Sequence, residues 1–225
     1  MGRTASALER TAQRLRDTFG ASVHTTACDV SSPDNVTRAF ADAVGRLGPV
    51  SILINNAGQA DAGPFEALSF DTWNRLIGVN LTGTFLCTQQ ALPPMVAAGS
   101  GRIVNIASTA GLKGYGRIAA YCAAKHGVVG LTRALAAETA RTGVTVNAVC
   151  PGYTEGTDMF AMALDNVSRG RGVSEGDARA ILAKQSPRGT LIALQEVADA
   201  VLWLCSPGAS AMTGQAIAVA AGEVM

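Results

Sequence analysis

Histidine is scarce in this sequence, and its cysteines form no recognisable group. The two histidines, His24 and His126, are far apart and lack partner ligands, so we expect no metal site. The five cysteines are odd in number and include no Cys-x-x-Cys pair, which argues against a disulfide framework and favours a reducing compartment. No apolar run approaches the roughly 20 residues needed to cross a bilayer, and the polar first residues are unlike a signal peptide. We therefore expect a cytoplasmic protein with no membrane partner.

A surplus of charge of either sign is also missing. The formal net charge is +1, which gives no electrostatic reason to expect nucleic acid or an anionic membrane as a partner. Charged residues make up only 16% of the 225 residues and hydrophobic residues 48%, so the chain can bury a sizeable core. We interpret residues 1–225 as a single α/β domain.

What is present is an alternation of helical and strand-like segments. The pattern predicts helices over 5–19, 33–47, 71–98 (interrupted near Pro93-Pro94), 118–141 and 195–204, and strands over 22–27, 50–54, 102–107, 144–149 and 215–219. Segments in this order form βαβ units, so we expect a doubly wound, Rossmann-like parallel sheet covered by helices on both faces. The more polar, irregular residues 153–188 are expected to form a lid over a substrate.

In a sheet of this kind, ligands bind beyond the carboxyl ends of the strands. Asn55-Asn56-Ala57-Gly58 follows one predicted strand, and its small residues would let a ligand approach the backbone closely. Asn and Gly are also ordinary turn formers, so this segment does not decide between the two interpretations.

A tyrosine and a lysine lie one helical turn apart. Tyr121 and Lys125 are separated by four positions, and a lysine ammonium there would lower the pKa of the phenol and make it a usable general acid or base. Ser108, just after another predicted strand, could donate to a carbonyl oxygen as charge develops on it. Spacing alone favours the alternative that Tyr121 and Lys125 are an ordinary half-exposed pair.

Together, these motifs resemble those of the short-chain dehydrogenase/reductase family. Ser108, a gap of twelve residues, and Tyr121-x-x-x-Lys125 are similar to the catalytic core of that family. Four other segments are similar to family motifs in the expected order: Cys28-Asp29-Val30, which would touch the adenine, the sheet-stabilising Asn55-Asn56-Ala57-Gly58, the helix asparagine Asn80, and the turn Pro151-Gly152, which leads into nicotinamide contacts. The resemblance covers essentially the whole chain and implies an NAD(P)-dependent enzyme that interconverts a ketone and a secondary alcohol.

The resemblance also implies a role for each catalytic residue. Tyr121 would protonate the nascent alkoxide during reduction, while Lys125 would lower the pKa of Tyr121 and bind the nicotinamide ribose. Ser108 would hold the carbonyl oxygen, and Asn80 would position a water that passes protons to bulk solvent. The hydride would come from the cofactor, whose further contacts are expected at Asn56, Ala57, Gly58, Pro151, Gly152, Thr154 and Thr157.

The sequence departs from the family pattern before its first predicted helix. The opening strand and glycine-rich phosphate loop, which bind the pyrophosphate in this family, have no counterpart in residues 1–225. Residues 111–116 contain three glycines but occupy the family's substrate loop, so we reject them as a phosphate site. In the family's strand order the missing strands would lie between residues 22–27 and 50–54. We therefore expect an exposed sheet edge, low stability or activity for residues 1–225 alone, and a natural protein about 40 residues longer.

The sequence also favours a cofactor, a substrate class and a form of assembly, each with an alternative. Arg3, with no acidic residue beside it, would pair with the 2′-phosphate of NADP and so favours NADP as the cofactor. NAD is the alternative. The overall texture resembles 3-oxoacyl reductases and 3-hydroxyacyl-CoA dehydrogenases, with polyketide, small-ketone and polyol reductases as alternatives. A homotetramer or homodimer through the long helices is expected. A non-catalytic scaffold relative is the alternative of another class, favoured by the missing phosphate loop and opposed by the intact catalytic set.

Overall fold

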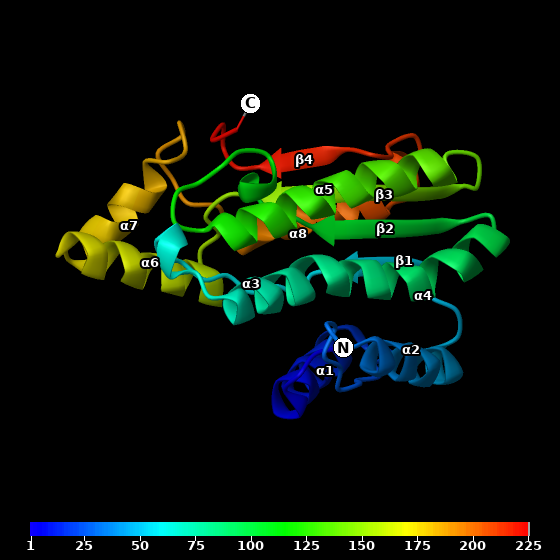
Figure 1. Ribbon diagram of the computed structural model, residues 1–225. Coiled ribbons are helices and arrows are strands. Elements are labelled where there is room, and N and C mark those ends of the chain that lie inside the picture. The colour runs from blue at the N-terminus through cyan, green and yellow to red at the C-terminus, as the bar shows by residue number, and fades with distance from the viewer. Residues whose placement is uncertain (225) are drawn as a thin grey trace.

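The computed structural model describes residues 1–224. Helices and strands alternate along most of the chain, as the sequence predicts (Figure 1). The helices are α1 (Ala5–Phe19), α2 (Pro33–Leu47), α3 (Phe70–Ile77), α4 (Gly83–Ala97), α5 (Ala119–Thr139), α6 (Asp158–Arg171), α7 (Glu175–Ala183) and α8 (Leu194–Cys205). The strands are β1 (Ile52–Asn55), β2 (Gly101–Ile106), β3 (Val144–Pro151) and β4 (Ala216–Val219). Short 3₁₀ turns lie at η1 (Phe65–Ala67), η3 (Thr109–Gly111) and η4 (Pro207–Ala209), and a π-helical turn at η2 (Gly78–Thr82).

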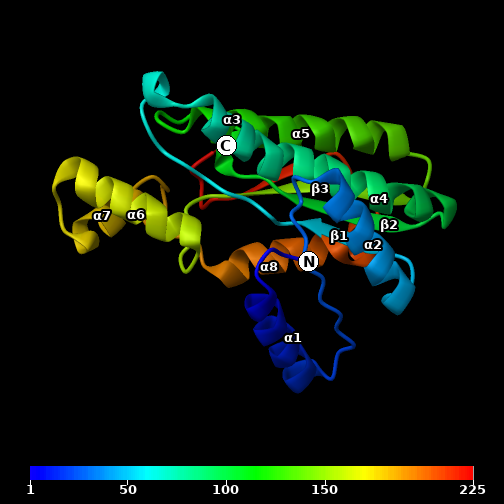
Figure 2. The same ribbon diagram turned by 60° about the horizontal axis from the view of Figure 1, so that its bottom comes forward.

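The strands form one parallel sheet in the order β1-β2-β3-β4. Helices α4 and α5 pack on one face and α8 on the other, as Figure 2 shows, which confirms the predicted doubly wound arrangement. β3 lies in the middle of this packing and is buried along almost its whole length. The strand arrows in Figure 1 point toward the side on which α6 and α7 lie, so these helices flank the carboxyl ends of the strands.

Several helix ends follow directly from local side-chain chemistry. Ser32 caps the start of α2 by accepting a hydrogen bond from the amide of Asn35, and Pro33 occupies the first turn. Gly20 ends α1 in the left-handed conformation (φ 61°), where glycine carries no steric penalty. The predicted bounds of α1 are confirmed to the residue, and α2 begins and ends where the sequence indicates.

Three sequence predictions are corrected by the structure. Residues 22–27 do not form a strand; the chain there is irregular apart from a single parallel bridge between Gly2 and Ala27. The helix predicted over 71–98 is interrupted at the π-helical turn η2, whereas Pro93 and Pro94 lie inside the continuous helix α4. Residues 153–188, expected to be irregular, contain the two helices α6 and α7.

The edge of the sheet at β1 is open to solvent. Among the described residues β1 pairs only with β2, and the side chains of Ile52 and Ile54 are 46% and 48% exposed. A parallel strand is ordinarily covered on both faces, so the exposed edge predicted from the sequence is confirmed.

A buried hydrogen-bond chain ties the sheet to its helices. The side-chain amide of Asn55 donates to Asn105 on β2 at 2.8 Å and to Thr88 on α4 at 3.0 Å. Asn105 in turn donates to the hydroxyl of Thr132 on α5 at 2.9 Å. Each of these four side chains therefore has a hydrogen-bond partner, which the low dielectric of the interior requires. Asn55 thus acts within the sheet, in agreement with the sheet-stabilising part predicted for its motif.

Within residues 1–224, the helices are too short or too polar to traverse a lipid bilayer. The same residues contain no cluster of three or more potential metal-ligating His, Cys, Asp or Glu side chains.

Candidate active site

The predicted catalytic side chains come together beyond the carboxyl ends of β1 and β2. Ser108 follows β2 and opens the turn η3, while Tyr121 and Lys125 lie on the first turns of α5. Asn80 belongs to the π-helical turn between α3 and α4, and it faces Gly58 in the segment that follows β1. Residues from four separate parts of the chain thus meet at the edge where a doubly wound sheet binds ligands.

Burial dominates the environment of Tyr121. Its hydroxyl lies 3.8 Å from the thioether sulfur of Met159, and Ala110, Cys122 and Tyr115 pack around its ring. Removal from water raises the pKa of Tyr121 to about 12, and the nearby Ser108 hydroxyl opposes this shift by favouring the phenolate. The lowering of the Tyr121 pKa by Lys125 that was expected from the sequence is therefore not seen; burial raises this pKa instead.

Lys125 is a buried cation beside this tyrosine. It is 3% exposed, its ammonium lies 5.6 Å from the centre of the Tyr121 ring, and it donates to the carbonyl oxygen of Ile106 at 2.7 Å. Burial lowers the pKa of Lys125 to about 8, so the ammonium form still predominates at neutral pH. The half-exposed pair that spacing alone favours is ruled out, since both side chains are buried.

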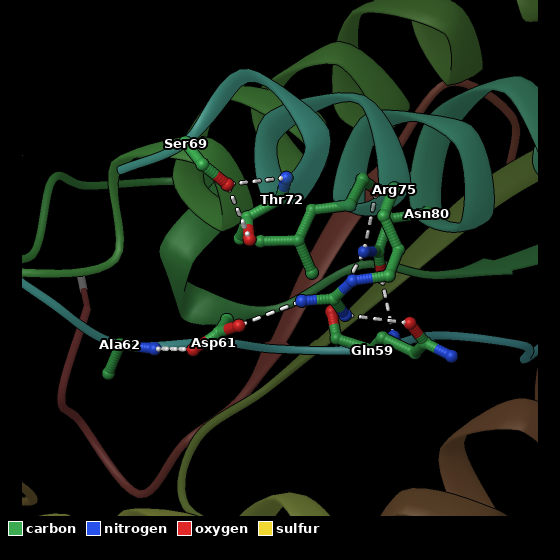
Figure 3. Close-up of polar contacts among 8 residues, drawn as sticks. Gln59, Asp61, Ala62, Ser69, Thr72, Arg75 and Asn80 are labelled. Carbon is green, nitrogen blue, oxygen red and sulfur yellow. Dashed lines mark hydrogen bonds and ion pairs between the residues drawn. The ribbon is translucent and has the colours of Figure 1, made fainter. Parts of the chain in front are cut away.

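Asn80 holds the segment that follows β1. Its side-chain oxygen accepts from the amide of Gln59 at 3.2 Å, and its nitrogen donates to the carbonyl oxygens of Gln59 at 2.8 Å and Leu76 at 2.9 Å (Figure 3). Arg75, one turn earlier, donates to the side chains of Gln59 at 3.0 Å and Asp61 at 2.7 Å. The loop beside the catalytic centre is therefore fastened to α3 and η2 through both backbone and side chains.

Gly58 leaves backbone space between these groups. A methyl group built on Gly58 would lie 3.0 Å from Asn80 Oδ1, 3.3 Å from Met159 Cε and 3.7 Å from Lys125 Nζ. The absence of a side chain keeps the space beside Lys125 open, and the ammonium has three donors, of which Ile106 takes one. This donor set fits the diol of a nicotinamide ribose, and Asn56, Ala57 and Gly58 would form the floor beneath it.

The turn after β3 is ordered by its own polar groups. Pro151 ends the strand, and the Thr154 hydroxyl donates to the carbonyl oxygen of Gly152 at 3.1 Å. Thr157 caps α6 by accepting from the amide of Phe160 at 3.1 Å and donates to the Thr154 carbonyl oxygen at 2.9 Å. The two threonines thus share one hydrogen-bonded turn. A cofactor contact from Thr154 or Thr157 stays a prediction.

The predicted adenine side of the site lies near the start of the chain. Asp29 accepts from the amide of Ser31 at 2.9 Å and from its hydroxyl at 2.7 Å. These hydrogen bonds lower the pKa of Asp29, and the charge of Arg3 lowers it further, which places Arg3 within electrostatic reach of Asp29. Val30 packs so closely against Gly83 that a methyl group there would lie 2.7 Å from it. Arg3 and Asp29 therefore lie near each other, and a contact of Arg3, Asp29 or Val30 with the cofactor stays a prediction.

Comparison with known proteins decides the family. The profile described as short chain dehydrogenase matches residues 1–167. The chain belongs to the short-chain dehydrogenase family. It is 43% identical over 217 residues to a protein of Streptomyces coelicolor that carries the provisional name ketoacyl reductase, covering 96% of this chain and 82% of that protein.

Other relatives of this short-chain dehydrogenase agree in fold. The 3-oxoacyl-[acyl-carrier-protein] reductase of Aquifex aeolicus is 34% identical over 221 residues, covering 98% of this chain and 84% of that protein. A crystal structure of a variant of actinorhodin polyketide ketoreductase with NADPH superimposes with a TM-score of 0.94 at 42% identity, covering 99% of this chain and 85% of that chain. The chain is therefore an oxidoreductase that has the α/β fold predicted from its sequence.

Three contributors to the site were not predicted as site residues. Met159 was included only in the lid segment, Arg75 was not singled out, and Glu223 lies far along the chain from the loop it contacts. A cavity of about 160 Å³ also lies beside the site, lined by residues 61–65, 67–69 and 117–120 together with Thr72 and Leu76. Part of its lining comes from the segment that follows Gly58.

The tyrosines of this dehydrogenase provide a direct test of the site's burial. Burial raises the pKa of Tyr115, Tyr121 and Tyr153 alike, and these are the three tyrosines of the sequence. Phenolate absorbance in the ultraviolet should therefore stay low as the pH passes the ordinary value of 10.0 and rise only beyond it. The same titration in concentrated guanidinium chloride should show ordinary ionisation. A native protein with half of its phenolate formed at pH 10.0 would contradict the described environment.

Proposed function

We propose that this short-chain dehydrogenase reduces the ketone of a 3-oxoacyl thioester to the secondary alcohol with NADPH, and that Tyr121 is the proton donor. The observation that carries the proposal is the burial of Tyr121 and Lys125 side by side at the edge of the sheet, with Ser108 beside the phenol. Relatives from two bacteria whose names specify ketoacyl or 3-oxoacyl reduction support the choice of substrate.

The side chains divide the work as follows. Ser108 donates to the carbonyl oxygen, and Tyr121 transfers its hydroxyl proton to that oxygen as negative charge develops on it. Tyr121 is protonated at neutral pH and therefore holds the proton that this direction requires. Lys125 stabilises the phenolate that remains, and Asn80 orders the loop and the water through which the proton is replaced.

The residues present fit the nicotinamide half of the cofactor. Asn56, Ala57, Gly58, Lys125, Pro151 and Gly152 would hold it, with Thr154 or Thr157 at the carboxamide. When bound, NADPH supplies the hydride. Arg3, beside Asp29 and Val30, would pair with a 2′-phosphate and so favour NADP over NAD.

The lid and the assembly are part of the same proposal. The segment 153–188, which contains α6 and α7 at the carboxyl ends of the strands, would close over the substrate, and its Met159 already contacts Tyr121. The long helices α4 and α5 would form the contacts of a homotetramer or homodimer. We place the enzyme in the cytoplasm, in keeping with its five free cysteines.

The function is tested by a substrate and cofactor panel. We expect kcat/KM to be highest for 3-oxoacyl thioesters with NADPH, and lower by about tenfold or more with NADH or with simple ketones. Replacement of Arg3 by alanine should reduce the preference for NADPH while leaving kcat with NADH nearly unchanged. A higher kcat/KM for simple or polycyclic ketones would instead assign the alternative within the family, a small-ketone or polyketide reductase.

Cofactor binding separates the enzyme from a scaffold. NADPH fluorescence should change on titration with the protein, independently of any substrate. A protein that binds neither NADPH nor NADH and turns over no carbonyl would contradict the proposed function and favour the non-catalytic relative.

A further inference from the structure

The carboxylate of Glu223, near the end of the chain, is buried outside the catalytic centre. Its side chain is only 2% exposed. The chain turns back to place it there, with Ala221 and Gly222 both in the left-handed region at φ 49° and 88°. Alanine rarely adopts this conformation, so the surrounding contacts must hold the turn in place. The hydroxyl of Ser186 supplies one such contact by donating to the carbonyl oxygen of Ala221 at 3.2 Å.

The partners of Glu223 lie in the loop between β2 and α5. Its carboxylate accepts a short hydrogen bond from the hydroxyl of Tyr115. The ammonium of Lys113 lies 3.6 Å from the same carboxylate and donates to the Glu223 carbonyl oxygen at 3.2 Å. The ammonium is also 4.9 Å from the centre of the Tyr115 ring. Figures 1 and 2 both show the segment that follows β4 beside this loop.

The carboxylate also touches the turn after β3. A methyl group on Gly152 would lie 2.8 Å from the second oxygen of Glu223, so the glycine makes room for this carboxylate. The negative charge of Glu223 contributes to the raised pKa of Tyr153, which places that phenol nearby as well. Glu223 therefore joins the β2–α5 loop to the turn that leads into the lid.

Tyr115 transmits this restraint to the catalytic centre. Its ring packs in the same apolar cluster as Tyr121, Cys122 and Met159. A loop held at Tyr115 has a fixed position in the apolar cluster that contains Tyr121, whose hydroxyl a substrate carbonyl must reach. A buried carboxylate without a partner would destabilise the folded protein. The contacts of Glu223 with Tyr115 and Lys113 are therefore strongly favoured over an open loop.

We infer that Glu223 is a positioning residue, whose buried carboxylate fixes Tyr115 and Lys113 so that the β2–α5 loop forms one wall of the substrate pocket. The expected change in KM rests on the proposed function. The restraint of the β2–α5 loop by Glu223 does not. Glu223 touches neither the phenol of Tyr121 nor the ammonium of Lys125, so the chemical step should survive its loss.

The kinetic test compares variants of Glu223 and Tyr115. We expect Glu223→Ala to raise KM for the carbonyl substrate by about tenfold, with kcat within about twofold and the KM for NADPH unchanged. Glu223→Gln, which can still accept from Tyr115, should recover most of the lost affinity. Tyr115→Phe keeps the ring and should raise KM as much as Glu223→Ala, and the double variant should be no worse than either single one. Additive effects, or an unchanged KM in both single variants, would overturn the inference.

A proteolysis test needs neither cofactor nor substrate. Lys113 and Arg117 are the trypsin sites of the β2–α5 loop, and Lys113 is held by Glu223. Trypsin should cleave after Lys113 at least about tenfold faster in Glu223→Ala than in the unaltered protein, because cleavage requires local release of the loop. The matched control is Glu9→Ala, which removes an exposed ion pair with Arg16 on α1. If Glu9→Ala accelerated this cleavage equally, or Glu223→Ala left it unchanged, the inference would be wrong whatever the enzyme's substrate.

Discussion

Replacement of Tyr121 by phenylalanine is expected to lower kcat by about a thousandfold or more, because a positioned general acid contributes roughly 10²–10⁴-fold and Ser108 alone cannot supply the proton. The variant keeps the ring that packs against Ala110 and Met159. The lost hydroxyl lies 3.8 Å from a thioether sulfur, a weak acceptor, and has the Ser108 hydroxyl beside it. The free energy of unfolding should therefore change little.

Single-turnover oxidation of NADPH with a 3-oxoacyl thioester measures this loss directly, and NADPH fluorescence measures whether the cofactor still binds. Tyr115→Phe is the matched control, because it removes a phenol hydroxyl from the same cluster and should leave kcat within about twofold. A Tyr121→Phe variant that keeps more than a tenth of kcat would contradict the assignment of Tyr121 as proton donor.

The helices with clear start and stop signals are those that the sequence predicts best. Ser32 and Pro33 fix the start of α2, and Gly20 fixes the end of α1, through bonds that involve only a few neighbouring residues. The break in the helix predicted over 71–98 was placed wrongly at Pro93-Pro94, because proline usually interrupts a helix. In the structure both prolines lie inside α4, which continues past them. The break lies instead at the π-helical turn that contains Asn80, whose side chain accepts from the distant Gln59 amide, a contact without a local sequence signal.

The strand predicted over 22–27 illustrates a different limit. Its residues have β-propensity, but a strand requires a hydrogen-bonded neighbour, and within residues 1–224 only the Gly2–Ala27 bridge supplies one. Sequence pattern can indicate which residues suit a strand and cannot supply the strand's partner. For the same reason Ile52 and Ile54 have the composition of a buried strand and yet lie half exposed.

The site residues that belong to sequence motifs could be predicted. The contacts between residues far apart in the sequence could not. Ser108, Tyr121 and Lys125 could be placed together from their spacing and from the family resemblance. The contact of Tyr115 with Glu223 joins residues 108 positions apart, and the contact of Tyr121 with Met159 spans 38, so neither leaves a local signal. The pKa of Tyr121 was misjudged for a related reason: desolvation depends on everything packed around the phenol, while sequence spacing reports only the lysine.

Lys125→Met should show separately what the buried ammonium contributes to kcat/KM and how much it lowers the free energy of unfolding. Loss of the cation beside Tyr121 is expected to lower kcat/KM by about a hundredfold or more, since preorganised charge at the reacting centre is worth roughly 10²–10³-fold. The thioether fills a similar volume in a site that is 3% exposed, so the packing should be retained. Lys184→Met, at an exposed position after α7, is the matched control and should leave kcat/KM unchanged.

The stability of the same variant should depend on pH in a defined direction. Burial lowers the pKa of Lys125 from 10.5 to about 8, so between these values the unfolded chain binds the proton more tightly than the folded protein does. The free energy of unfolding of the unaltered protein therefore rises with pH across this window, by about 3 kcal/mol from this group, and Lys125→Met lacks that rise. Denaturant unfolding at neutral pH and near pH 10 should thus show Lys125→Met losing about 3 kcal/mol relative to the unaltered protein. A stability difference that is the same at both pH values would mean that Lys125 is not buried as a cation, and a loss of kcat/KM below tenfold would remove it from the catalytic set.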